Sequence, residues 1–337
     1  MNNIEKENEF FSSKYILSYS GLNKLLFNPS LFYRHYILKQ REDTTDKSAV
    51  EGKLIHCLLL EPLSFDNVFK ITMNSLPGDN AKTVIDRLYN HYKELKRNDD
   101  TTSSDINDYK NAILDILTDM GLHQSLKTDE SRVDKILNTK NIEYWDHLNL
   151  SENKILIDEN TYTFANNIVE KIKSIDYIKT IRGENEPGCD VLNEILLESS
   201  DFEYEFGIRG IIDNLVFDHL NKEIRINDLK TTSKSLSNFS DSIEFYKYWL
   251  QASIYKMLVE KTYRSTFELR DYNISFRFIV VDAYGQIGTI QVSESTLKSW
   301  EEKTLNILDN VNLHHFINRN FSLPYDFLKF KNQELII

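Results

Sequence analysis

An aspartate and a lysine stand two residues apart in the stretch Glu223–Thr232, which reads EIRINDLKTT. Apolar and polar residues alternate in this stretch, and such alternation is typical of a β-strand. Because side chains two apart leave the same face of a strand, we predict that Asp228 and Lys230 lie side by side. The carboxylate suits a hard metal ion, and the amine beside it could hold an anionic oxygen or polarise a water molecule.

A second strand is predicted just upstream, over Arg209–Phe217. A short polar link, Asp218–Lys222, joins the two runs, so we predict a β-hairpin. The alternation of the upstream strand puts Asp213 on the same face as three apolar residues, Ile211, Leu215 and Phe217. Asp213 would then lie on the same side of the hairpin as Asp228.

The register of this hairpin decides the electrostatics. If the turn is centred on Leu220 and Asn221, Asp213 lies directly opposite Asp228. Two carboxylates in such positions, with Cβ atoms about 4.5–5.5 Å apart, oppose folding unless a positive charge lies between them. Carboxylates suit Mg²⁺ or Mn²⁺, so the sequence predicts a divalent cation here. A slip of one residue would send one aspartate to the other face.

Length and charge limit the classes of protein that fit. A chain of 337 residues can bury a large core, in one large domain or two smaller ones. The formal charge of −12 argues against a protein that coats nucleic acid, although an enzyme with one local positive groove stays open. No apolar run approaches the ~20 residues of a membrane span, and the first residues are too polar for a signal peptide. We therefore expect a cytoplasmic protein without a membrane partner.

Two classes of cofactor do not fit the sequence. Cys57 and Cys189 are the two cysteines, too few for a four-thiolate zinc or iron–sulfur site, and we interpret both as buried apolar residues. The stretch Gly78–Thr83 resembles a phosphate-binding loop, but Ala81 stands where that loop needs a glycine before its lysine. We expect neither an iron–sulfur cluster nor ATP.

Most of the first half of the chain reads as helix. Ser18–Phe27 is predicted to be a capped helix, and Ala49–Pro62 a strongly apolar one that carries His56. Taken alone, His56 is either a core histidine or a metal ligand. Residues 63–185 are mostly helical in pattern. After a turn cluster at 183–188, the pattern predicts strands, a helix, strands and a helix, an order typical of an α/β fold.

Five elements, taken in order, resemble the PD-(D/E)XK nuclease superfamily, and more narrowly its RecB/RecE-type branch, which includes phage and prophage exonucleases. The elements are Gly52-x-x-x-His56, Glu194, Gly210-x-x-Asp213, Asp228-x-Lys230-Thr231 and Gln251-x-x-x-Tyr255. Each element alone is a weak signal, but five in this order are hard to obtain by chance. The opening run, with Ser18, Ser20 and Pro29 followed by Phe32-Tyr33, is similar to the N-terminal helices of that branch.

The resemblance implies an α/β (α+β) fold with a restriction-endonuclease-like core, in which helices flank a mixed central β-sheet, plus a long helical insertion. We expect one nuclease domain over residues 1–337. Within it, residues 15–62 would form the N-terminal helices with the histidine motif, residues 63–185 the helical insertion and residues 186–337 the core. The insertion is either a clamp specific to this family or an oligomer surface.

The resemblance also implies roles for single residues. Asp213 and Asp228 would be metal ligands, with His56 as a further ligand. Glu194 would lie beside them and orient a water molecule or a ligand. Lys230 would position or activate the attacking water and stabilise charge on the phosphate.

The remaining candidates would face the DNA. On a helix predicted from Asp241 to Thr262, Gln251 and Tyr255 are four apart and share a face. They would line the DNA-facing side of the site, or they are an ordinary packing pair. Four more side chains either contact the DNA backbone or are solvated loop residues: Arg209, Thr231, Thr232 and Lys234.

The resemblance implies a Mg²⁺-dependent exonuclease, with Mn²⁺ able to substitute. It would hydrolyse linear double-stranded DNA to expose single strands for recombination or repair, in the cytoplasm of a bacterial or phage-infected cell. Relatives of this kind work with a single-strand annealing or recombination protein and often form a ring-shaped homo-oligomer around DNA, so we expect both. Two alternatives stay open: a structure-specific or single-strand endonuclease of the same fold, and a catalytically inactive DNA-binding or assembly subunit.

Overall fold

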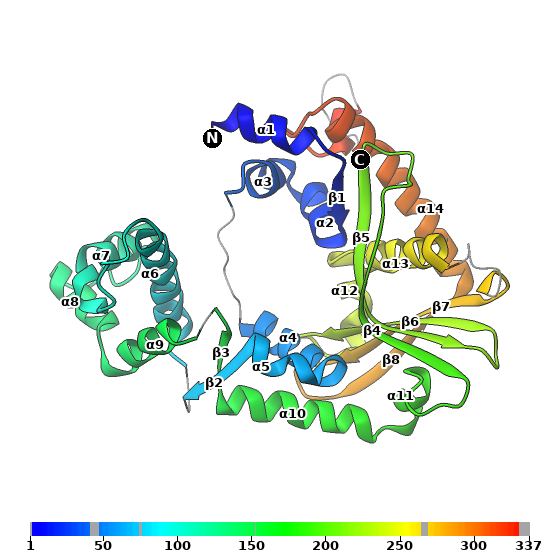
Figure 1. The fold of residues 1–337 in the computed structure, drawn as a ribbon, viewed down its shortest axis with the longest axis horizontal. Coiled ribbons are helices and arrows are strands. Elements are labelled where there is room, and N and C mark those ends of the chain that lie inside the picture. The colour runs from blue at the N-terminus through cyan, green and yellow to red at the C-terminus, as the bar shows by residue number, and fades with distance from the viewer. Residues whose placement is uncertain (1, 41–46, 74–75, 152, 264–268, 330–337) are drawn as a thin grey trace. The chain divides into compact units, whose positions relative to one another are not determined.

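The chain folds into two compact units. The computed structural model describes residues 2–40, 47–73, 76–151, 153–263 and 269–329 (Figure 1). One unit, here called the sheet unit, comprises Met1–Asp43 and Lys171–Ile337. The other, here called the helical unit, comprises Thr44–Glu170. The predicted division at residues 62 and 185 stays a prediction.

The sheet unit is built on a six-stranded mixed sheet. Its strands are β1 (Tyr15–Ser18), β4 (Cys189–Ser199), β5 (Phe206–Asp218), β6 (Glu223–Thr231), β7 (Asn273–Val281) and β8 (Ile287–Val292). The order is β1-β5-β6-β7-β8, and β4 also pairs with β5. The β1–β5 and β6–β7 pairs are parallel, whereas β4–β5, β5–β6 and β7–β8 are antiparallel. Helices flank this sheet, so the predicted mixed central sheet is confirmed.

Some helices of this unit begin at a capping residue. They are α1 (Asn3–Phe11), α2 (Tyr19–Phe27), α3 (Pro29–Phe32), α11 (Asp176–Ile181), α12 (Phe239–Phe245), α13 (Tyr248–Tyr263), α14 (Glu294–Val311) and α15 (Tyr325–Leu328). Ser18 and Asn28 cap α2 and α3 by accepting hydrogen bonds from main-chain N–H groups. The single helix predicted from Asp241 to Thr262 is wrong, because Lys247 takes a left-handed φ of 55° and separates α12 from α13.

The hairpin of β5 and β6 has the predicted register. The paired residues end at Asn214 and Asn227, and the same register sets Asp213 opposite Asp228. The apolar residues on this side of the two strands are buried in the core of the sheet unit. The turn between two alternating runs was therefore enough to place the aspartates opposite each other.

The strand β5 changes face partway along its length. Ile212 and Leu215 both lie completely buried in the same core, although they are three residues apart. In a regular strand, residues three apart point to opposite faces, so the backbone must switch sides between them. Ile211 is 49% exposed, so the prediction that it shares a face with Leu215 is wrong.

The neighbouring strand β4 is distorted at the same point. The β4–β5 pairs before and after Glu194 set this residue opposite Asp213. Glu194 has a left-handed φ of 49° within the strand. Such a residue interrupts the alternation of side chains, as a β-bulge does, and the two strands curve together (Figure 1). A glutamate rarely adopts this conformation, which costs about 1–3 kcal/mol unless the surroundings hold it. The distortion therefore marks the place where a function is expected.

The helical unit has its own core and a small two-stranded sheet. Its elements are α4 (Lys47–Leu60), α5 (Phe65–Val68), β2 (Phe69–Met73), α6 (Asp79–Asn98), α7 (Lys110–Asp119), α8 (Asp129–Ile136), α9 (Thr139–Asn149), β3 (Ile155–Asp158) and most of α10 (Glu159–Ser174). The core includes Leu88, Tyr92, Tyr144 and Trp145. Its helices confirm the predicted helical character, but the parallel pair β2–β3 was not predicted.

The two cysteines are free thiols. Cys57 in α4 is buried, as predicted. Cys189 at the start of β4 is half-buried, and its sulfur accepts a hydrogen bond of 3.4 Å from Arg225, which also pairs with Asp218. The interpretation of Cys189 as a buried apolar residue is therefore wrong, because an ion pair lies beside its sulfur.

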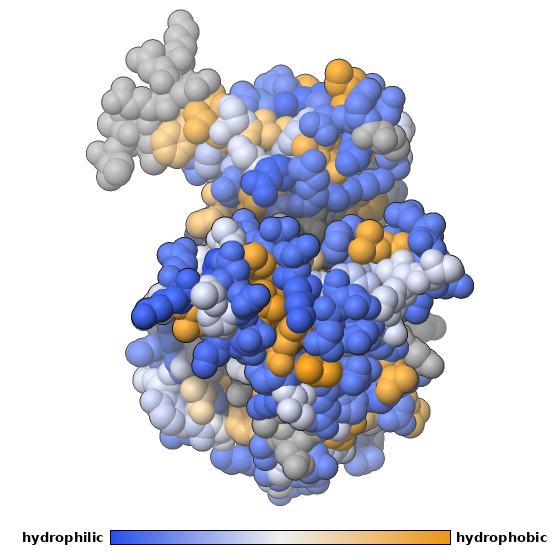
Figure 2. Space-filling view, turned by 90° about the vertical axis from the view of Figure 1, so that its left-hand side faces the viewer, coloured by the Kyte–Doolittle hydropathy of each residue, from blue (hydrophilic) through white to orange (hydrophobic). Residues whose placement is uncertain are grey.

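The surface is mainly hydrophilic on the face drawn in Figure 2, where hydrophobic residues are scattered among hydrophilic ones. Scattered apolar side chains are normal on a protein surface. Among the described residues, none of the helices combines the length and the apolar character that crossing a membrane requires.

The close approach of α13 to β5 generates a stability prediction. A Cβ atom on Gly210 would lie 2.6 Å from Cε1 of Tyr255, whose ring is buried, so something must shift. We expect Gly210→Ala to lower the free energy of unfolding of the sheet unit by about 1–3 kcal/mol. A Cβ on Gly21, in α2, meets nothing closer than 3.5 Å. Gly21→Ala is therefore expected to leave stability unchanged or raise it by about 1 kcal/mol.

Denaturant titrations of both variants would measure these changes. Equal stability of the two variants would contradict the close packing of Gly210 on Tyr255.

Candidate active site

The centre of the site is a buried ion pair at the end of β6. Asp228 is completely buried, and its Oδ2 lies 2.6 Å from Nζ of Lys230, whose side chain is 15% exposed. Their contact confirms that the two side chains leave the same face of the strand. Burial alone would lower the pKa of Lys230, but the Asp228 and Asp213 carboxylates outweigh it and raise the pKa above its usual value. Beside these carboxylates, Lys230 is therefore a hydrogen-bond donor.

A second carboxylate lies where the β5–β6 ladder ends. Oδ2 of the buried Asp213 accepts a hydrogen bond of 2.7 Å from the main-chain N–H of Leu229. This side chain thus takes the part that a main-chain carbonyl plays in a regular ladder. The bond fixes the Asp213 side chain at the point where the β5–β6 ladder ends.

The distorted residue of β4 brings a third carboxylate. A carboxylate oxygen of Glu194 lies within 4.8 Å of one of Asp213. Burial raises the pKa of the Tyr255 phenol well above its usual value, and Asp228, Asp213 and Glu194 add to this rise. The ammonium of Lys230 offsets one of these three negative charges, which leaves an excess of negative charge among these four described residues.

The residues present fit a divalent cation. Oxygen donors are the ligands that hard cations such as Mg²⁺, Mn²⁺ and Ca²⁺ prefer. Carboxylates this close, at low exposure, repel one another unless a cation or a proton separates them. Asp213 and Glu194 would supply oxygens at the distorted end of the strand pair, and Asp228 lies opposite in register.

Gln251 and Tyr255 form the wall of the site on α13. Both side chains are buried, and Nε2 of Gln251 donates a hydrogen bond of 2.8 Å to the Tyr255 hydroxyl. The predicted contact four residues apart is confirmed. Oε1 of Gln251 is buried and has no hydrogen-bond partner among the described residues. An orphaned acceptor is costly, so a bound water or ligand is expected to satisfy it.

Two tyrosines of the site were missed by sequence reasoning. The ring of Tyr248 lies 4.8 Å from Nζ of Lys230, in the range of a cation–π contact. Tyr19 donates a hydrogen bond to the main-chain carbonyl of Tyr246. Burial raises the pKa of the Tyr19 and Tyr248 phenols, and Asp228 adds to this rise. Tyr248 stands three residues before Gln251, so helical spacing could have indicated it.

The candidates for DNA contact lie near the ends of strands. Arg209 and Lys234 are exposed, and Thr231 and Thr232 are half-exposed. Nζ of Lys234 lies 5.9 Å from the Phe245 ring. These positions leave all four side chains accessible to a ligand, and their contact with DNA stays a prediction.

The remaining candidate ligand belongs to the other unit. His56 lies in α4 of the helical unit and is half-buried. All the other predicted site residues belong to the sheet unit. A role for His56 as a metal ligand therefore stays a prediction that rests on the resemblance.

The comparison with protein families agrees with this geometry. The sequence model of the PD-(D/E)XK nuclease superfamily matches residues 16–312. This chain belongs to the PD-(D/E)XK nuclease superfamily. Nucleases of this superfamily use divalent metals, which the carboxylates of the site fit. The match takes in both units, including the helical unit that sequence reasoning could compare only in general character.

Comparisons with individual proteins say less about this chain than the family model does. No curated protein matches this chain. A solved structure from Eubacterium rectale, described as a "putative exonuclease", is 11% identical, with a TM-score of 0.44 over 93% of this chain and 82% of the other. A second, SSO0001, is 11% identical, with a TM-score of 0.23 over 46% of this chain and 70% of the other. Neither similarity is close enough to assign an activity to this PD-(D/E)XK protein.

The contact between Tyr248 and Lys230 predicts a graded loss of nuclease activity. Tyr248→Phe keeps the ring under the ammonium, so we expect its rate to stay within about threefold of the wild type. Tyr248→Leu removes the ring, and a buried cation–π contact of about 2 kcal/mol corresponds to a loss of about 30-fold. Initial rates of DNA digestion, at matched thermal stability, would measure this difference. Equal rates for the two variants would show that the ring does not position Lys230.

Proposed function

We propose that this protein is an exonuclease of the RecB/RecE-type branch that uses Mg²⁺, or Mn²⁺ in its place. It degrades one strand of linear double-stranded DNA and so exposes single strands for recombination or repair. The observation that carries the proposal is the buried pair of Asp228 and Lys230 beside the carboxylates of Asp213 and Glu194, in a member of a nuclease superfamily.

The acidic residues would hold the metal. Asp213 and Asp228 are the proposed ligands in the sheet unit, His56 is the proposed ligand from the helical unit, and Glu194 orients a water molecule or completes the ligand set. A divalent cation bound there would act as a Lewis acid that offsets negative charge developing on the scissile phosphate. Without it, the three carboxylates of the sheet unit would repel an incoming phosphate.

Lys230 would position or activate the attacking water and stabilise charge on the phosphate. Its side chain can donate hydrogen bonds to that water or to a phosphate oxygen. Asp228 and the ring of Tyr248 both contact this ammonium. A side chain held in this way loses little freedom when the substrate binds.

The neighbouring polar groups would order the substrate. Oε1 of Gln251 could accept a hydrogen bond from a water molecule in the site, while Tyr255 holds the amide in place. Arg209, Thr231, Thr232 and Lys234, all accessible, would contact the sugar–phosphate backbone. These contacts position DNA without reading its sequence.

Several further features of the proposal rest on the resemblance. Two cysteines are too few to supply the four that hold the iron–sulfur cluster of some members, so we propose no such cluster here. We propose that it works with a single-strand annealing or recombination protein, as a ring-shaped homo-oligomer, in the cytoplasm of a bacterial or phage-infected cell. Residues 15–62, 63–185 and 186–337 would then be the histidine-bearing helices, an insertion and the nuclease core.

Removal of the central pair should abolish digestion. We expect Asp228→Asn and Lys230→Met each to slow Mg²⁺-dependent digestion of end-labelled linear duplex DNA by at least about 100-fold, or about 2.7 kcal/mol. Lys298→Met is the control, because it removes the same charge from an exposed position on α14. It should digest DNA at the wild-type rate. Full activity of Lys230→Met would refute the proposed function.

Substrate form and metal dependence test the rest of the proposal. EDTA should stop digestion, and added Mg²⁺ or Mn²⁺ should restore it. Linear duplex DNA should be degraded while nicked circles and single-stranded circles stay intact. Cutting of circles at the same rate would assign a structure-specific or single-strand endonuclease instead. Binding of DNA without any digestion would assign an inactive DNA-binding or assembly subunit.

A further inference from the structure

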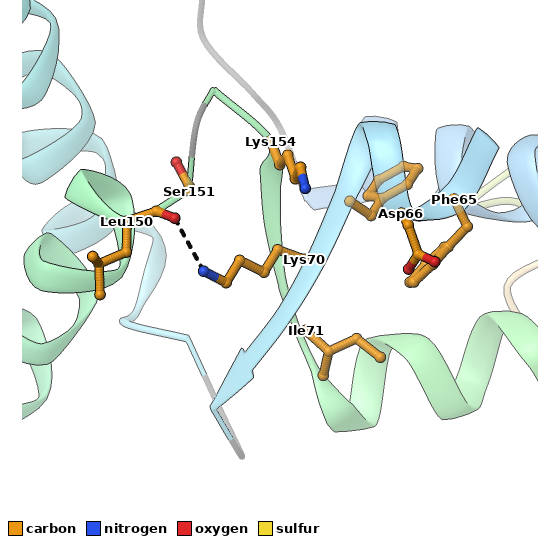
Figure 3. Close-up of a pocket in the computed structure, with 8 residues that line it drawn as sticks. Phe65, Asp66, Lys70, Ile71, Leu150, Ser151 and Lys154 are labelled. Carbon is orange, nitrogen blue, oxygen red and sulfur yellow. Dashed lines mark hydrogen bonds between the residues drawn. The ribbon is translucent and has the colours of Figure 1, made fainter.

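The helical unit has a surface pocket, but the lysines that line it do not converge on one ligand. The pocket lies beside α5, β2 and the residues before β3 (Figure 3). The side chains of Lys70 and Lys154 extend in opposite directions there, and Nζ of Lys70 donates a hydrogen bond of 3.0 Å to the main-chain carbonyl of Leu150 (Figure 3). A set of polar side chains that do meet one another lies in the sheet unit, beside the candidate active site.

Three asparagines form a row across the strands that carry the site. They are Asn193 in β4, Asn214 in β5 and Asn227 in β6. Asn193 pairs with Asn214 in the β4–β5 register, and Asn214 pairs with Asn227 in the β5–β6 register. Each asparagine is next in the chain to one carboxylate of the site, in the pairs Asn193-Glu194, Asp213-Asn214 and Asn227-Asp228. The row of asparagines therefore runs beside the row of carboxylates.

Hydrogen bonds join the three side chains across the strands. Nδ2 of Asn227 donates a hydrogen bond of 2.7 Å to Oδ1 of Asn214, and Nδ2 of Asn214 donates one of 2.8 Å to Oδ1 of Asn193. Nδ2 of Asn227 also donates one of 2.9 Å to the main-chain carbonyl of Ile181, the last residue of α11. Neighbouring residues of a strand point to opposite faces, so Asn214 and Asn227 lie on the other side of the sheet from the aspartates. The row thus links three strands to one helix end.

The row lies where the regular pairing of the strands ends. Asn214 and Asn227 are the last paired residues of the β5–β6 ladder, and beyond them the Leu229 N–H donates to the Asp213 side chain. On the β4 side, the pairing is interrupted at Glu194, with its left-handed φ. The asparagines therefore hold the strands together at the last regular position before the carboxylates.

Stability alone does not account for amides at this place. Asn214 and Asn227 are 2% and 1% exposed, and a buried amide costs free energy unless it is hydrogen-bonded. Apolar residues of similar size would avoid this cost, because replacing both partners of a buried hydrogen bond can leave stability nearly unchanged. The row also leaves Oδ1 of Asn227 without a hydrogen-bond partner among the described residues. What the amides provide is a directional bond that fixes each strand relative to the next.

Metal binding needs ligands at fixed spacing. Mg²⁺ requires near-ideal octahedral geometry, with oxygen ligands at about 2.0–2.1 Å, so a small shift of one strand would remove a ligand. We propose that the row of Asn193, Asn214 and Asn227 sets the spacing of the three carboxylates around the divalent cation. The asparagines are positioning residues, because they act through the strands. The inference rests on the proposed function, which places a cation among these carboxylates.

Metal affinity tests this assignment, because it reports on the carboxylates without requiring digestion. We expect Asn214→Leu, which removes the middle amide, to raise the Kd for Mn²⁺ measured by calorimetry by about tenfold. Asn193→Ala changes only the exposed end of the row, so folding should tolerate it, and it should raise this Kd by up to about fivefold. Excess Mn²⁺ should restore most of the wild-type digestion rate in both variants, with an unchanged KM for linear duplex DNA.

A double-mutant cycle tests whether the amides act as one row. Asn227→Leu alone is also expected to raise the Kd for Mn²⁺ by about tenfold. Independent residues would give about 100-fold in the double variant, whereas a row already broken by one substitution should give about tenfold again. A product of the two single effects would overturn the inference that Asn214 and Asn227 act together.

Two control variants separate positioning from a loss of stability. Val292→Ala truncates a buried residue of the same core on β8 and lowers stability, but it should leave the Kd for Mn²⁺ unchanged. Asn273→Ala removes an exposed asparagine at the start of β7 and should leave it unchanged too. A rise as large for Val292→Ala as for Asn214→Leu would overturn the inference.

The exposed end of the row keeps the test decisive if Asn214→Leu does not fold. An unchanged Kd for Mn²⁺ in Asn193→Ala would then overturn the inference, while metal-dependent digestion by the wild type would leave the proposed function intact. A wild type that binds no Mn²⁺ would refute the proposed function, and the inference with it.

Discussion

The opposition of Asp213 and Asp228 at the end of the β5–β6 ladder is the constraint on which the site depends. A regular ladder would set the two carboxylates opposite each other. Here the ladder ends just before them, and the Leu229 N–H donates to the Asp213 side chain instead. The ammonium of Lys230 pairs with Asp228. The remaining negative charge is what makes the place suitable for a divalent cation. Fold and chemistry therefore have one electrostatic cause.

The tyrosines around this pair set its dielectric surroundings. Tyr248 and Tyr255, both on α13, cover the charged groups with aromatic rings, and their raised pKa values keep the phenols neutral. Charges in such a place interact more strongly than in water. Gly210 allows this cover, because the absence of a side chain lets Tyr255 come close to β5. The glycine of the motif is thus explained by packing on a tyrosine of the same site.

The positions of site residues could be predicted from the sequence where a periodic pattern and a short turn act together. Alternation and the turn placed Asp213 opposite Asp228, and a spacing of two put Asp228 beside Lys230. The left-handed backbone of Glu194 was not predictable, because a glutamate gives no signal for it. Without that distortion the exposure of Ile211 could not be foreseen either. Tyr248 had a usable spacing, but an aromatic residue at a helix start is more often part of the core.

The unusual backbone of Glu194 has a thermodynamic consequence. Folding must hold a glutamate in a conformation that its unfolded chain rarely visits, next to a carboxylate that repels it. A ligand that binds the native carboxylates, and not the unfolded chain, adds RT ln(1 + [L]/Kd) to the free energy of unfolding. Folding and the binding of the metal ion are then linked equilibria. The sheet unit would be most stable in the state that is ready for catalysis, and the ion that completes the chemistry would also act as a folding cofactor.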